Sequence, residues 1–174
     1  MNEPQRRTVL KALGTAGATL ALGGVGTASA RKRRGASGDD TIVDIAVEAD
    51  DFNVLVAAVT EAGLVDTLSG NRQLTVFAPT DDAFDKLGVT ADNVGDVDFE
   101  AAVGASLTEI LTYHVTPGRR YAASIVNAPR FNTLNGADVA VDGTVLNDGQ
   151  ATIVDTDIEA SNGVVHVIDG VLLP

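Results

Sequence analysis

The sequence contains no cysteine and no tryptophan, and only 4% of its residues are aromatic. The absence of cysteine excludes disulfides, thiolate zinc sites, thiol nucleophiles and lipid-modified cysteines. A chain without disulfides must be held together by burial of apolar side chains. With 45% apolar residues in a length of 174, the sequence has enough of them for one small domain with its own core.

Basic residues are scarce and unevenly distributed. The chain carries 24 acidic residues against 12 basic ones. Beyond residue 34 the balance is 23 acidic against five basic, a net charge of −18. Such a surface repels nucleic acid, whose binding requires neutralised phosphates, so nucleic acid is excluded as a partner. The five basic residues are Arg72, Lys86, Arg119, Arg120 and Arg130.

This excess of acid bears on the medium in which the protein works. Like charges destabilise a folded chain unless salt screens them, and at ~1 M salt the Debye length is only ~3 Å. The acids are mostly aspartate and lysine is rare. We therefore predict a halophilic, archaeal source. An ordinary acidic domain is the alternative.

The first 30 residues have the features of an export signal. Residues 5–11 read QRRTVLK, and the uncharged stretch that follows ends in ASA at residues 28–30. A basic head, an apolar middle and a small-residue exit are the parts of such a signal, and the pair Arg6 and Arg7 resembles the twin-arginine type. We predict a signal over residues 1–30 and a secreted or cell-surface location. The alternative is an uncleaved segment that stays in the membrane.

A short basic segment follows the predicted signal. Residues 31–38 read RKRRGASG, which indicates a flexible linker, with contact to a membrane surface as the alternative. The folded domain is then predicted over residues 39–174.

The first half of this domain has helical periodicity. Apolar residues recur at i, i+3, i+4 and i+7 over residues 42–49, and a second helix is predicted over residues 52–63. After a β-rich run and Thr80, a short helix should turn Phe84 and Leu87 inward. A further helix is predicted over residues 98–112.

The second half consists of short β-rich segments. Residues 113–115 are a strand candidate that ends at the turn sequence TPG. No internal repeat is present. These features predict an α+β fold with a mostly antiparallel sheet. The hairpin signals are Asn135-Gly136, Asp142-Gly143, Asp148-Gly149 and Asn162-Gly163.

Three segments resemble those of one known family. Residues 75–84 read TVFAPTDDAF, residues 113–118 read YHVTPG, and residues 162–174 read NGVVHVIDGVLLP. In this order and spacing they resemble fasciclin (FAS1) domains, over about residues 41–174. The resemblance implies a β-sandwich or wedge with helices packed against it, and a non-catalytic role in adhesion outside the cell. In animal members the Tyr-His segment is linked to integrin binding, which transfers here only to Tyr113 and His114 as a location.

His114 and His166 are the only histidines. His166 alternates with apolar residues in a segment that is apolar on both faces, so we expect a neutral core residue hydrogen-bonded to backbone. The alternative, a metal ligand, would need further ligands nearby, and Asp169 is the only local candidate. For His114 the two interpretations are a hydrogen bond that holds the turn and a share in a recognition surface.

A basic and aromatic spot follows the Tyr-His segment. Arg119, Arg120 and Tyr121 stand out on an acidic domain, and an exposed aromatic residue beside arginine is a plausible anchor for a partner. We therefore predict partner contacts by Tyr113, His114, Arg119, Arg120 and Tyr121. Pairing of the arginines with neighbouring carboxylates is the alternative.

No recognisable catalytic set is present. Residues 104–108 (GASLT) lack the last glycine of a nucleophile elbow, and the spaced acids at residues 96–100 and 155–157 lack the glycine of a calcium loop. We expect no enzyme, no cofactor and no metal. The predicted function is adhesion through a protein or glycan at the cell surface. The alternatives are a carrier of a small apolar ligand between sheet and helices, and a hydrolase without a recognisable motif.

Overall fold

The computed structural model describes residues 39–174, and these contain seven α-helices and seven β-strands. The predicted signal and linker lie outside the described residues. None of the described helices is long and apolar enough to cross a bilayer. The helices are α1 (Ile42–Glu48), α2 (Asn53–Glu61), α3 (Val65–Ser69), α4 (Asp81–Asp85), α5 (Phe99–Val103), α6 (Leu107–Tyr113) and α7 (Ala122–Val126), with a 3-10 turn η1 (Asn147–Gly149). The strands are β1 (Leu74–Pro79), β2 (Val115–Pro117), β3 (Arg130–Asn132), β4 (Asp138–Asp142), β5 (Val145–Leu146), β6 (Ala151–Ala160) and β7 (Gly163–Ile168).

The strands form one curved sheet in the order β2-β1-β7-β6-β5-β4-β3. β1 and β7 run parallel, and every other neighbouring pair is antiparallel. The two ends of this order meet, because Leu134 N–H donates to the Val115 carbonyl (2.7 Å) and Thr116 Oγ1 donates to the Asn132 carbonyl (2.6 Å). The predicted α+β class with a mostly antiparallel sheet is confirmed.

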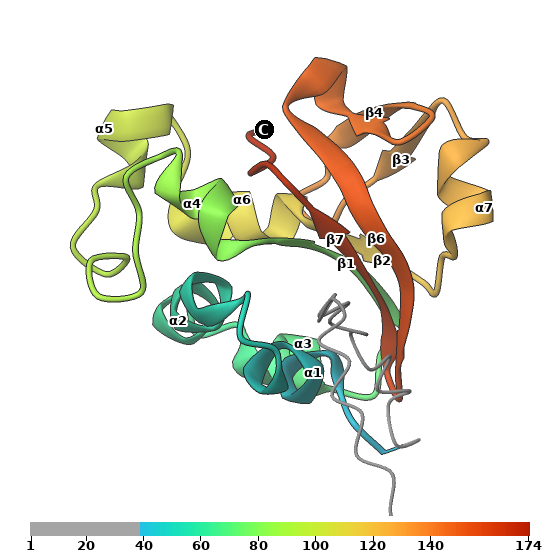
Figure 1. The fold of residues 1–174 in the computed structure, drawn as a ribbon, viewed down its shortest axis with the longest axis horizontal. Helices are drawn as coiled ribbons and strands as arrows, with labels where there is room; N and C mark the ends of the chain where they lie inside the picture. Colours follow the sequence, from blue (N-terminus) through green and yellow to red (C-terminus); the bar gives the residue numbers. More distant parts are fainter. Residues whose placement is uncertain (1–38) are drawn as a thin grey trace, which may run out of the picture. The chain divides into compact units, whose positions relative to one another are not determined.

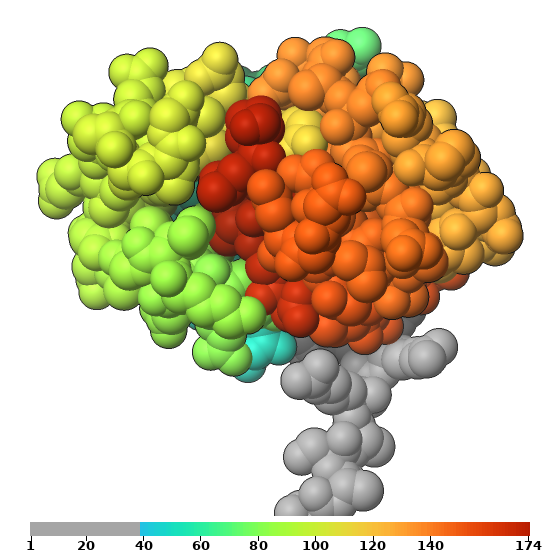
Figure 2. All heavy atoms as spheres, turned by 90° about the horizontal axis from the view of Figure 1, so that it is seen from above, coloured from blue at the N-terminus to red at the C-terminus, as the bar shows by residue number. Residues whose placement is uncertain are grey.

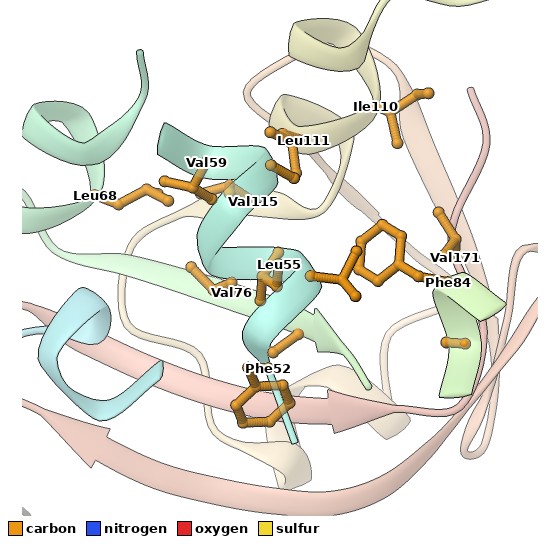
Figure 3. Packing of buried hydrophobic residues seen from close by; sticks show 14 of the residues in the cluster. Phe52, Leu55, Val59, Leu68, Val76, Phe84, Ile110, Leu111, Val115 and Val171 are labelled. Carbon is orange, nitrogen blue, oxygen red and sulfur yellow. The ribbon is translucent and has the colours of Figure 1, made fainter. Parts of the chain in front are cut away.

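The sheet is curved, as Figure 1 shows. Apolar side chains are buried on both of its faces. On one face, Leu55 of α2 lies beside Val76 of β1 and Val115 of β2 in the core against the helices (Figure 3). In the core on the other face, the rings of Phe77 and Phe131 stack with centroids 4.7 Å apart. β7 serves both cores, and all six of its residues are buried. A strand that is apolar on both faces requires this central place.

All four predicted hairpin signals lie between antiparallel neighbours in the sheet. Gly136, Gly143 and Gly149 take positive φ angles of 96°, 62° and 98° there, which glycine adopts without steric cost. Gly163 is required for a different reason, since a Cβ at this position would collide with the Leu74 carbonyl.

The segment from residue 98 to 115 differs from the prediction. The expected single helix is two helices, because Gly104 takes φ 78° and Ser106 begins α6 with a capping box to Glu109. α6 then continues through Tyr113, with His114 as its C-cap. The predicted strand at residues 113–115 is therefore wrong, and β2 begins only at Val115.

Two smaller predictions also fail. Leu87, which we expected to face inward, is 41% exposed because α4 ends before it, whereas Phe84 is buried as predicted. Helix α3 was not predicted at all, since five residues are too few for the helical periodicity to show.

The C-terminal residues lie between the helical part of the described domain and the β4–β6 region, where Figure 2 shows them in red. Side chains around η1 hold them there. Asn147 Nδ2 donates to the Leu173 carbonyl (3.1 Å), and Gln150 Oε1 accepts from Leu173 N–H (2.8 Å). This places Leu172 next to His114.

Candidate functional site

His166 joins three segments that are distant in sequence. Its Nε2 lies 2.9 Å from the Arg120 carbonyl, and its Nδ1 accepts from Asp157 N–H at 3.3 Å. These contacts fit one neutral tautomer, with the proton on Nε2. The side chain is fully buried beside the ring of Phe77. Burial lowers the pKa of His166, against the opposing effects of the Arg120 carbonyl and the Asp157 carboxylate.

Asp157 lies where β6 bulges over this histidine. The register between β6 and β7 shifts twice between Ile153 and Ile158, and Asp157 takes the left-handed φ of 59°. Its Oδ1 accepts from Ala122 N–H, the first residue of α7, at 2.7 Å. The same oxygen lies 4.0 Å from His166 Nδ1. Asp157 therefore connects the imidazole to the start of α7.

His114 has a different role at the end of α6. Its Nδ1 donates to the Ile110 carbonyl (2.7 Å), and its Nε2 accepts from Leu172 N–H (2.9 Å). The ring thus takes the opposite tautomer to that of His166 and fastens the C-terminal residues to α6. Burial lowers the pKa of His114 to about 4, although the bond to Ile110 opposes this.

Both histidines therefore have both ring nitrogens bonded to backbone groups. This agrees with the expectation that His166 is a neutral core residue hydrogen-bonded to backbone. Within residues 39–174 no three His, Asp or Glu side chains are placed to hold a metal ion. Asp169, the one local candidate for a ligand, instead accepts from Thr152 N–H (2.7 Å).

The arginine and aromatic spot lies on the surface above His166. The Arg119 guanidinium donates from Nε to Gln73 Oε1 (2.9 Å) and from a terminal nitrogen to the Ala160 carbonyl (2.7 Å). Its hydrogen-bond acceptors within the described part of the chain are all uncharged. Tyr121 is 39% exposed, and its hydroxyl donates to Glu159 Oε1 (2.9 Å).

Arg120 lies between these two residues and is partly exposed. Its backbone is fixed, since its N–H donates to Thr75 Oγ1 (2.8 Å) and its carbonyl accepts from His166. Among the described residues, none forms an ion pair or hydrogen bond with its guanidinium. The alternative, that Arg119 and Arg120 pair with carboxylates, finds no such pair among the described residues, whereas Arg130 lies 3.8 Å from Asp138. We call residues 119–121 the arginine corner.

The five predicted contact residues thus lie at two depths. Tyr113 and His114 are 3% and 2% exposed, so their side chains are inside the described domain. Tyr113 donates its hydroxyl to the Asp138 carbonyl (3.1 Å), and burial followed by the Asp138 charge raises its pKa. The arginine corner lies at the surface. Partner binding by these residues stays a prediction.

Sequence reasoning missed the residues that support the corner. Gln73 and Glu159 bond to the corner across 46 and 38 residues of sequence, and Asp157 bonds to the adjacent Ala122 across 35. The spacing of the acids at residues 155–157 drew attention only as a weak calcium pattern. Nothing in the local sequence indicated that Asp157 would cap the distant helix α7.

The space between sheet and helices bears on the carrier alternative. An apolar cavity of about 40 Å³ lies beneath α1, bordered among others by Val59, Leu68 and Val115. Small-molecule sites usually measure ~300–1,000 Å³. A cavity this small holds no lipid or other drug-sized apolar ligand, so this space does not favour a carrier.

Comparison with known proteins identifies a matching family and several relatives of this chain. Residues 50–174 match the Fasciclin domain family. The chain is 42% identical over 135 residues to the uncharacterized protein sll1735 of Synechocystis, covering 76% of this chain and 96% of that protein. It is 40% identical over 116 residues to the immunogenic protein MPB70 of Mycobacterium bovis, covering 66% of this chain and 56% of that protein.

A solved structure shares the fold. The FAS1 domain pair of the insect cell adhesion molecule Fasciclin I superposes with a TM-score of 0.57 at 17% identity, over 78% of this chain and 51% of that one. The predicted FAS1-like fold is confirmed. The archaeal source, the twin-arginine signal and the domain boundary at residue 39 stay predictions. By its family match and its relatives, this chain belongs to the fasciclin (FAS1) domain family.

Proposed function

We propose that this chain is an exported, non-catalytic interaction domain that holds cells to one another or to envelope material. Its partner is a protein or a glycan at the cell surface, and the twin-arginine segment with Arg6 and Arg7 directs its export. Membership of the fasciclin family supports this proposal. So does the adhesion molecule whose domain pair shares the fold, although only the fold is shared.

The arginine corner carries the proposal, because no carboxylate among the described residues pairs directly with its two guanidinium groups. In a region with 23 acidic residues, a guanidinium would be expected to pair with a carboxylate. Arg119 is instead held by Gln73 and backbone carbonyls, and none of the described residues bonds the guanidinium of Arg120. Two positive charges beside an exposed tyrosine thus remain available to an acidic partner. Tyrosine and arginine are the residues that most often dominate binding interfaces.

The test compares cells lacking the gene with cells that regain it in wild-type or altered form. Arg119→Gln with Arg120→Gln removes two charges from the corner, and we expect cell aggregation to fall several-fold, towards that of the deletion. The matched control, Lys86→Gln with Arg130→Gln, removes the same charge elsewhere and should aggregate normally. Thermal melting of each purified variant checks that it folds.

Two results would count against the proposal. Normal aggregation in the deletion strain would refute adhesion as the function. Loss of aggregation in the deletion, but not in the Arg119/Arg120 variant, would refute the corner as the contact surface. Substitution of the buried Tyr113 or His114 is a poor test, because it would disturb the fold as well as any contact.

A further inference from the structure

The arginine corner rests directly on a group that can take up a proton. His166 bonds through Nε2 to the carbonyl of Arg120, and Asp157, which bonds to Nδ1, also caps α7 at Ala122. Tyr121 is the N-cap residue of that helix. Anything that moves Asp157 therefore acts on both sides of Tyr121.

Asp157 has one hydrogen-bond arrangement in the structure and a second within short reach. While His166 is neutral, Asp157 N–H donates to Nδ1 and Asp157 Oδ1 accepts from Ala122. If Nδ1 took up a proton, its new N–H would face the Asp157 N–H across 3.3 Å, so that two hydrogen-bond donors would point at each other. The same carboxylate oxygen is only 4.0 Å from Nδ1 and is the acceptor that the new N–H lacks.

The local backbone suits such an exchange. Asp157 lies within the second register shift of β6, between Asp155 and Ile158, and takes a left-handed conformation that is unfavourable for a non-glycine residue. Its side chain is 41% exposed, so it can move without disturbing the core. Ala122 is partly exposed, and its released N–H can bond to water.

We propose that the arginine corner is gated by protons: uptake of a proton by His166 draws the Asp157 carboxylate from Ala122 to the imidazolium, frees the start of α7, and weakens partner binding. The effect on binding rests on the proposed function, whereas the movement of α7 does not. The proton comes from solvent, and no covalent bond other than Nδ1–H forms.

Charged groups around His166 are few, which keeps the exchange local. From β6 the near group is Asp157, with Asp155 and Glu159 further along the strand. The segment before α7 contributes the carbonyl of Arg120, and β1 contributes the uncharged ring of Phe77. α7 itself has no titratable residue. Burial lowers the pKa of His166, and the hydrogen bond to the Arg120 carbonyl and the attraction of the Asp157 carboxylate oppose this effect.

The experiment follows the folded full-length chain by NMR between pH 8 and pH 5. We expect the Ala122 amide resonance to shift with the same midpoint as the His166 ring. Exchange of the Ser124 and Ile125 amides, corrected for intrinsic rates, should rise about tenfold or more below that midpoint. Labelled protein should bind to cells several-fold less at pH 5 than at pH 7.5.

Two variants separate the gate from general effects of acid. Asp157→Asn can still cap Ala122 but offers no charge to the imidazolium, so its α7 should respond far less to pH. Asp98→Asn changes a cap of the same kind, at 3.0 Å from Ala101 N–H, and should behave as wild type. If Asp157→Asn does not fold, His166→Gln takes its place, with an α7 that is independent of pH.

An Ala122 resonance that ignores the titration of His166, or an Asp157→Asn variant that responds as wild type does, would overturn the gate. If Ala122 titrates with His166 but no binding to cells occurs at any pH, the proposed function fails and the movement stands. If binding is strong and independent of pH, the gate fails and the proposed function stands.

Discussion

His114 and His166 are both buried and neutral, with both ring nitrogens bonded to backbone, yet their surroundings differ. The region around His114 brings α6 and the C-terminal residues together, and the pKa of its imidazole lies at about 4. The region around His166 includes Asp157, a carboxylate 4.0 Å from the ring and partly exposed to water.

The difference shows how the same type of side chain stabilises the fold at one position and can respond to pH at another. A proton on His114 Nε2 would face the Leu172 N–H, and no nearby acceptor within the described domain could take the new hydrogen bond. Protonation would therefore lower the free energy of unfolding of the whole domain. A proton on His166 has an acceptor waiting in Asp157. The same chemical event is therefore global in one region and local in the other.

The largest expected effect comes from removing each imidazole in turn. His114→Phe leaves the Leu172 N–H without an acceptor in the interior, and we expect the free energy of unfolding to fall by about 3 kcal/mol. His166→Phe should lower it by only about 1 kcal/mol, because the Asp157 N–H lies at a bulge that water can reach. Urea unfolding at pH 7.5 measures both. Equal losses would contradict the comparison.

Acid should separate the two regions next. A histidine whose pKa is lowered by folding stabilises the chain fully above the unfolded pKa of about 6.5 and loses that contribution as the pH falls towards the folded value. With a folded pKa of about 4, His114 should lower the unfolding free energy by about 2 kcal/mol between pH 7 and pH 5. Urea unfolding of His114→Phe over the same range should show a much smaller slope.

The capping carboxylates do not disturb this measurement. The pKa of Asp44 is lowered chiefly by the side-chain hydrogen bond from Thr41, and that of Glu109 chiefly by the backbone hydrogen bond from Ser106. Groups with lowered carboxyl pKa values lose their contribution only as the pH falls below their usual range, near 4. A slope in His114→Phe as steep as in wild type would show that another group controls acid stability.

Local patterns predicted much of the fold but only part of the site. The alternation around His166 predicted a buried strand, and each Asn-Gly or Asp-Gly pair predicted a hairpin, because these signals depend on neighbouring residues. Tyrosine has a high β propensity, which favoured a strand at Tyr113. The capping box at Ser106 instead begins a helix that extends to Tyr113. Here helix capping and packing outweighed the local β propensity.

The support of the site lies outside such patterns. Asp157 meets Ala122 only because β6 bulges beside the segment that follows β2, and Gln73 meets Arg119 only because β1 pairs with β2. These contacts depend on the register of a folded sheet. Periodicity and spacing along one sequence carry no information about that register.

Salt should raise the thermal stability of the domain by the same amount whichever histidine is replaced. The net charge of −18 beyond residue 34 is spread over the surface, and ~2 M KCl reduces its repulsion almost completely. We expect the melting temperature to rise by about 5 °C or more from ~0.1 M to ~2 M KCl, equally in wild type, His114→Phe and His166→Phe. A melt that does not change with salt would contradict the predicted halophilic adaptation, and a different rise in one variant would place the repulsion near that histidine.

The smallest expected effect concerns the pKa of His166. Asp157 raises this pKa by attraction at 4.0 Å through a partly solvated gap, and salt screens such an interaction. Between ~0.1 M and ~1 M KCl, the midpoint of the His166 ring in an NMR titration should therefore move further down than in Asp157→Asn, where only the diffuse field of the surface remains. Equal shifts in wild type and Asp157→Asn would mean that the carboxylate does not act on the ring, and His166 would then be a structural group of the same kind as His114.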